Sequence, residues 1–72
     1  MTISSDSAKE LARLGVDLEI SSDSGYSSDS VKDIIRIVVA DGRRITVHAG
    51  KYSSDSLKEM ARIGKEHICI RI

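Results

Sequence analysis

The chain has 72 residues, enough for one domain near the lower size limit at which a hydrophobic core holds a fold without disulfides, metal or a partner. Eleven basic and eleven acidic residues cancel, so no net field steers the protein toward nucleic acid or an anionic membrane. An apolar share of 40% and a charged share of 31% exclude a disordered or collagen-like chain.

The longest uninterrupted apolar run, residues 37–40, is too short for a transmembrane span or for the core of a signal peptide. The single cysteine, Cys69, excludes an intramolecular disulfide and gives no indication of an oxidising compartment. We therefore expect a soluble protein of the cytoplasm or of recombinant expression, without a targeting signal.

Internal repetition is the strongest pattern in the chain. The tetrapeptide SSDS occurs at residues 4–7, 21–24, 27–30 and 53–56. Three copies run directly into similar segments, AKELARLG from Ala8, VKDIIRIV from Val31 and LKEMARIG from Leu57. Their apolar residues recur three and four positions apart, which predicts amphipathic helices. The chain is therefore predicted to be a single domain, residues 1–72, of three helix-then-strand units, with the SSDS copy at 21–24 left over as a loop.

The SSDS serines predict where each helix begins, in one of two frames. In the first frame the last serine is the cap, because an acid follows it in the spacing of a capping box. These pairs are Ser7 with Glu10, Ser30 with Asp33 and Ser56 with Glu59. In the second frame the middle serine is the cap, and the aspartate lies in the first turn, where negative charge favours the helix dipole. These pairs are Ser5 with Asp6, Ser28 with Asp29 and Ser54 with Asp55.

Glycines predict where the helices end, because glycine adopts the left-handed conformation at low cost. The predicted stops are Gly15, Gly42 and Gly64. Alternating apolar residues follow each stop and predict a strand with one buried face. They are Val16, Leu18 and Ile20, then Ile45, Val47 and Ala49, then Ile68, Ile70 and Ile72. The opposite face carries Asp17 and Glu19, then Arg44, Thr46 and His48, then His67, Cys69 and Arg71.

The dipeptide Asp41-Gly42 leaves a second interpretation open for residues 37–41, because it also forms the turn of a β-hairpin. A hairpin would place Arg36 on the same face as Val38, whereas a helix gathers the apolar residues on one stripe. The helix is favoured, although the branched residues in its last turn lower its intrinsic propensity.

The order of helices and strands predicts a two-layer α/β fold with a three-stranded parallel sheet in the order 1-2-3. Crossovers between parallel strands are almost always right-handed, and strands with one apolar face need all three helices on one side of the sheet. A short edge strand at residues 1–3 is left open, because Ile3 precedes its SSDS as Ile20 precedes the second copy.

His48, His67 and Cys69 fall on the open face of the predicted sheet, and imidazole and thiolate are ligands that bind zinc and copper. The trio lacks a clear fourth ligand, and scattered polar residues are the usual content of a solvated sheet face. We therefore assign no catalytic, cofactor-binding or metal-binding residue, and keep the trio only as an alternative metal site.

Other kinds of site have less support. Helix starts lie where parallel sheets often bind phosphate, but each already carries an aspartate, and Gly50-Lys51 lacks the rest of a phosphate loop. The aspartates Asp6, Asp23, Asp29 and Asp55 show no calcium-loop spacing. No G-x-S-x-G turn is present, and the open face has no aromatic platform for RNA. The sequence therefore predicts no enzyme, no cofactor, and no small-molecule, nucleic-acid or membrane partner.

The reused SSDS caps, the glycine stops, the absence of proline and the parallel segments AKELARLG and LKEMARIG resemble a de novo designed α/β mini-protein. The resemblance covers the whole chain and implies a structural scaffold with no biochemical activity. The run IIRIVV and the free cysteine depart from usual design practice.

The bare face of the sheet supports an alternative function, because most parallel sheets are covered on both faces. That alternative is a small binding or self-association module that uses the open face or an edge strand. Asp17 and Glu19 on the first strand suit a two-fold self-complementary contact with the basic residues of the other strands, which are Arg44, Arg71 and the histidines His48 and His67. A homo-oligomer is the one partner that the sequence allows.

Overall fold

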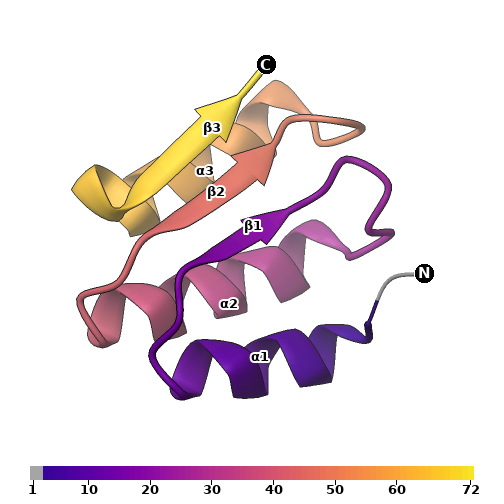
Figure 1. Cartoon of the computed structure of the whole chain (residues 1–72). Helices are drawn as coiled ribbons and strands as arrows, with labels where there is room; N and C mark the ends of the chain where they lie inside the picture. The colour runs from indigo at the N-terminus through magenta and orange to yellow at the C-terminus, as the bar shows by residue number, and fades with distance from the viewer. Residues whose placement is uncertain (1–2) are drawn as a thin grey trace.

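The computed structural model describes residues 3–72. The elements are α1 (Ser5–Arg13), β1 (Leu18–Ile20), α2 (Ser28–Ala40), β2 (Ile45–His48), α3 (Ser54–Gly64), the 3₁₀ turn η1 (Lys65–His67) and β3 (Ile68–Arg71). The predicted α/β class and the parallel sheet in the order 1-2-3 are confirmed. Figure 1 shows the three helices side by side against one face of the sheet, so the other face stays open.

The first serine of SSDS caps each helix. Ser4, Ser27 and Ser53 have extended backbones, and each side-chain oxygen accepts a hydrogen bond of 3.2 Å from the amide three residues later. Both predicted frames therefore placed the cap too late. The last serine of each tetrapeptide instead lies in the first turn, where its hydroxyl accepts a hydrogen bond of 3.1 Å from the capping hydroxyl. The first-turn aspartate of the second frame is confirmed.

The leftover SSDS copy and residues 37–41 follow the favoured predictions. Residues 21–24 contain no helix or strand. Residues 37–40 belong to α2, so the hairpin is wrong. Ile34, Ile35 and Val38 are 0% exposed in this helix, and such burial outweighs the low propensity of branched residues.

Gly64 does not end α3 in the predicted way. Gly15 and Gly42 do adopt a left-handed φ, of 84° and 70°, whereas Gly64 stays helical and the positive φ of 51° falls on Lys65. A Cβ on Gly64 would lie 2.7 Å from Cβ of Ile68 and 3.3 Å from Cγ2 of Ile35. Gly64 is therefore required for the close approach of α3 to β3.

The core lies between the helices and the sheet. Ten apolar residues there are nearly inaccessible to solvent: Ala8, Ala12, Ile20, Val31, Ile34, Ile35, Val38, Ile45, Val47 and Met60. The strands are shorter than predicted, because Val16, Ala49 and Ile72 lie outside them. Ile3 is not in a strand either, and the other two residues of the possible edge strand, 1 and 2, lie outside the described residues.

In the described part of the chain, none of the helices combines the length and the apolar character needed to cross a membrane.

The capping role of the first serine is testable at α2. Replacing Ser27 with alanine leaves the amide of Ser30 without its acceptor, so we expect a loss of about 1 kcal/mol in the free energy of unfolding. Urea titration followed by circular dichroism measures this loss. Ser28→Ala in the same tetrapeptide is the matched control and should cost only a few tenths of that. An equal loss of stability in both variants would show that Ser27 is not the capping residue.

The close approach at Gly64 is testable in the same assay. Alanine gains about 1 kcal/mol in helix propensity, whereas overpacking against Ile68 costs about 1–3 kcal/mol, so Gly64→Ala should be destabilised. Lys65→Gly relieves the positive φ and should be at least as stable as the parent chain. A stabilised Gly64→Ala variant would contradict the tight contact.

Candidate functional site: the open face of the sheet

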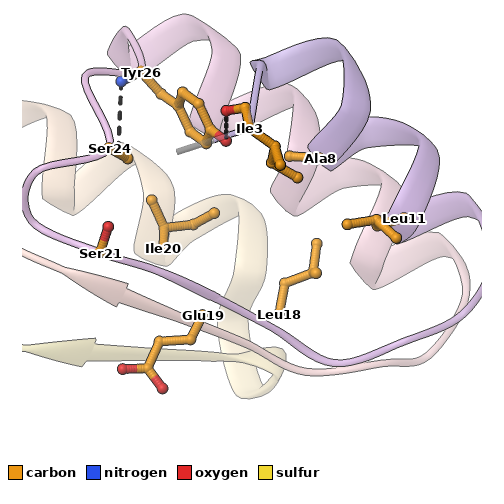
Figure 2. A pocket seen from close by; sticks show the side chains of 9 residues that line it. All are labelled: Ile3, Ala8, Leu11, Leu18, Glu19, Ile20, Ser21, Ser24 and Tyr26. Carbon is orange, nitrogen blue, oxygen red and sulfur yellow. Dashed lines mark hydrogen bonds between the residues drawn. The ribbon is translucent and has the colours of Figure 1, made fainter. Parts of the chain in front are cut away.

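Polar side chains from all three strands occupy the face of the sheet away from the helices. Figure 2 shows Glu19 pointing away from α1, on the opposite side of β1 from Leu18 and Ile20. The register places Glu19 level with Thr46, and Thr46 level with Cys69. One step of the alternation further along, His48 is level with Arg71. These five residues form what we call the open face.

Glu19 and His48 make the closest polar contact on the open face. The two residues are diagonal neighbours on β1 and β2, and their Oε2 and Nε2 atoms are 2.6 Å apart. A carboxylate only accepts hydrogen bonds, so Nε2–H of His48 is the donor. Glu19 is held across the strands, and one ring nitrogen of His48 is occupied.

The electrostatics of the open face favour an ionised Glu19. The hydrogen bond from His48 holds the pKa of the Glu19 carboxyl below its ordinary value of 4.5, and the positive charges of His48 and Arg71 act in the same direction. Glu19 on β1 and Arg71 on β3 therefore place opposite charges at the two edges of the face. The expected distribution is found only in part, because Asp17, Arg44 and His67 lie outside the strands.

His48, His67 and Cys69 do not come together as a metal site. The ring of His67 bonds to the carbonyl oxygen of Arg43, before β2 begins, whereas His48 is the last residue of β2, so the length of this strand, about 10 Å, separates them. Ligands of one zinc ion lie within about 4 Å of one another, because each is about 2 Å from the metal. Among residues 3–72, no three His, Cys, Asp or Glu side chains gather in a way that could hold a metal ion.

His67 was placed on the open face by parity, and the structure corrects this assignment. His67 lies in η1, before β3 begins, where strand parity no longer applies. Its Nδ1–H donates to the carbonyl oxygen of Arg43 at 3.0 Å. His67 therefore joins the third helix-strand segment to the second. This turn was not predicted, because the glycine stop was expected at Gly64 and the strand directly after it.

The aspartates of the SSDS segments lie apart from one another. Asp6, Asp29 and Asp55 each occupy the first turn of a different helix. Asp23 lies in the loop after β1, where a hydrogen bond from the Ser21 hydroxyl lowers its pKa below the ordinary value of 3.8. Each aspartate thus has a local role in its own cap or turn.

A shallow hollow of about 600 Å³ lies at the carboxyl ends of β1 and β2. It is lined by Ser22, Asp23, Gly25, Tyr26, Lys51 and Tyr52. Parallel sheets usually bind ligands at this place. The lining contains both the cation Lys51 and the anion Asp23, so it does not favour a ligand of one charge. The sequence analysis did not predict that Lys51, Tyr26 and Tyr52 lie together. Their positions in the loops after two neighbouring parallel strands could have indicated it, because these loops leave the sheet at the same end.

Comparison of the chain with models of protein families, with curated proteins and with solved structures found no match.

The contact between Glu19 and His48 predicts a dependence of stability on acid. Because the pKa of Glu19 is lowered in the folded state, its contribution is complete above 4.5 and is lost as the pH falls through the lowered value. Glu19→Gln should therefore unfold with a weaker pH dependence below 4.5 than the parent chain, measured by thermal unfolding across a pH series.

The variant His48→Ala removes the same hydrogen bond and should show the same weakening. Combining it with Glu19→Gln should add little, because both changes remove one interaction. Fully additive effects of the two changes would show that Glu19 and His48 do not interact in solution.

Proposed function

We propose that the protein is a designed structural scaffold with no biochemical activity of its own. The observation that carries the proposal is the identical use of SSDS at all three helices. The capping serines have φ and ψ of −67° and 158°, −68° and 158°, and −68° and 159°. Three of the four SSDS copies therefore serve to start helices, which is how capping residues are used in designed proteins.

The use of the other polar groups supports the same proposal. The hydroxyl of Tyr26 donates to the carbonyl oxygen of Ile3 at 2.6 Å, and that of Tyr52 donates to the carbonyl oxygen of Tyr26 at 2.9 Å. Asp17 accepts from the amide of Arg44 at 3.1 Å. These groups connect one part of the fold to the next. A cytoplasmic or recombinant setting fits a chain whose one cysteine, Cys69, is a free thiol.

A second candidate function is binding or self-association through the open face. The observation in its favour is the separation of charge on that face, with Glu19 on β1 and Arg71 on β3. Two copies related by a two-fold axis would set the acid of each against the base of the other. Such a contact would cover the face of the parallel sheet that the helices leave bare.

The scaffold proposal is tested by native mass spectrometry of protein purified without chelators. The expected masses are those of the chain or of whole multiples of it, with no bound metal, nucleotide or other small molecule. Elemental analysis of the same sample checks zinc, copper and calcium. A species that is retained at a fixed ratio through purification would overturn the proposal.

The open-face candidate is tested by light-scattering mass across a range of protein concentrations. If the open face mediates association, Arg71→Glu should shift the protein toward monomer, because it faces Glu19 of the other copy. Arg62→Glu on the exposed side of α3 makes the same change in net charge and should have no effect. Equal masses for the parent chain and Arg71→Glu would reject this candidate.

A further inference from the structure

One ion pair occurs twice between consecutive helices. Lys9 of α1 lies 3.7 Å from Asp33 of α2, and Lys32 of α2 lies 2.8 Å from Glu59 of α3. Alignment of AKELARLG, VKDIIRIV and LKEMARIG makes Lys9 equivalent to Lys32, and Asp33 equivalent to Glu59. Each pair therefore joins the lysine of one segment to the acid of the next.

The same alignment leaves one member of the pair at each end of the molecule. Lys58 of α3 is equivalent to the two paired lysines, and Glu10 of α1 is equivalent to the two paired acids. Both side chains are exposed, and within residues 3–72 neither takes part in an ion pair. They have complementary charges and lie on the two outermost helices (Figure 1).

Apolar burial follows the same pattern on the α1 side. Ile34 and Met60, at equivalent positions of α2 and α3, are 0% exposed, whereas the equivalent Leu11 of α1 is 37% exposed. The next position toward this side is Leu14, which is 77% exposed. The positions equivalent to Leu14, Ile37 of α2 and Ile63 of α3, are half-buried against the core. On α1 both positions are exposed because no helix precedes it.

At the α3 side, the residues that face the next helix in α1 and α2 are uncovered. Ala12 of α1 and Ile35 of α2 are 0% exposed and face the next helix, whereas the equivalent Ala61 of α3 is exposed. Ile68 and Ile70 of β3 are only half-buried, although the equivalent residues of β2 are at most 1% exposed. The end of the molecule at α3 and β3 therefore presents the surface that the first two segments bury.

The two edges of the sheet also match. The amide of Leu18 donates to the carbonyl oxygen of Arg44, just before β2, at 3.4 Å, so by alternation the amide and carbonyl of Glu19 point outward from β1. All three strands are parallel, and β3 is the other edge. A β3 edge placed beside a β1 edge of another copy would therefore continue the sheet in the same direction.

A hollow at the β1 edge could receive apolar side chains of a second copy. It measures about 270 Å³, and its lining includes Ile3, Ala8, Leu11, Leu18, Ile20 and Tyr26. Figure 2 shows Leu18 and Ile20 on one side of it and Ala8 and Leu11 of α1 on the other.

We propose that the protein associates head to tail, with α3 and β3 of one copy packed against α1 and β1 of a second copy. The contact repeats the packing that already joins α1 to α2 and α2 to α3. Lys58 pairs with Glu10 of the second copy, and Ala61 packs against its Leu11 and Leu14. Because the two surfaces differ, the association is heterologous and builds rings or filaments rather than a closed two-fold dimer.

The proposed contact between copies lacks one hydrogen bond that the contacts within the chain have. The tyrosines that precede the capping serines of α2 and α3 each donate to the preceding segment, but the equivalent residue before Ser4 is Ile3, which has no hydroxyl. The contact between copies is therefore weaker than those within a chain. Its extent should depend on protein concentration.

The proposal is tested by exchanging the charges at the two ends, with sedimentation velocity as the readout. The parent chain should increase in mass with concentration. Glu10→Lys and Lys58→Glu should each lower the association constant by about tenfold, because each sets like charges against each other. An equimolar mixture of the two variants should regain association, since every contact between unlike copies has opposite charges. The double variant should regain it as well.

Controls separate this contact from the open face and from loss of folding. Leu14→Glu should abolish association while leaving the far-ultraviolet circular dichroism unchanged, because Leu14 is exposed. Arg62→Glu matches the charge change of Lys58→Glu and should associate like the parent chain.

Three results would overturn the proposal: a parent chain that stays monomeric at millimolar concentration, single variants that associate like the parent, or a mixture that fails to recover. Weakening by Arg71→Glu, with no effect of Glu10→Lys, Lys58→Glu or Leu14→Glu, would assign association to the open face instead. The scaffold proposal concerns bound ligands, so it stands or falls separately.

Discussion

Burial of the middle helix and strand by their neighbours is the constraint on which the structure depends. Val31, Ile34, Ile35, Val38, Ile45 and Val47 all come from α2 and β2, and none is more than 1% exposed. Full burial of such a side chain contributes roughly 1.5–3 kcal/mol, so this group supplies a stabilisation comparable to the roughly 5–15 kcal/mol by which domains are stable. A chain without tryptophan or phenylalanine obtains its core by this layered packing of aliphatic residues.

This dependence on neighbours explains how the polar residues are used. The helices cover only one face of the sheet, and the alternation of the strands then places Glu19, Cys69 and Arg71 in solvent, with Thr46 and His48 half-buried on the middle strand. Separate strands bring together groups that are distant in sequence, as the contact of 2.6 Å between Glu19 and His48 illustrates.

The ends of the molecule follow from the same constraint. In a fold where each helix-strand segment is covered by the one before and the one after, the first and last segments each keep one uncovered side. Repeat proteins protect such sides with polar terminal segments. Here Leu14 and Ile72 stay largely exposed, and Lys58 and Glu10 stand where the internal contacts have ion pairs. The two end surfaces thus carry the same kinds of residue as the surfaces that the internal contacts bury.

The sequence by itself determined the helices, the strands, their order and the identity of the open face. These features depend on local periodicity, on first-turn aspartates and on left-handed glycines such as Gly15 and Gly42, which residues close in sequence decide. The sequence did not determine which serine of SSDS caps the helix. All three serines have the same chemistry, and they differ only in how well each fits the start of the helix.

Only the tertiary structure decided the role of Gly64, the position of His67 and the partner of Glu19. Gly64 is needed because β3 approaches α3 too closely for a Cβ, and the turn at Lys65 then removes His67 from the strand and from any site with His48 and Cys69. Distances of this kind depend on the register and separation of elements far apart in the chain. Periodicity fixes which face a side chain is on, but packing alone fixes how near it comes to another.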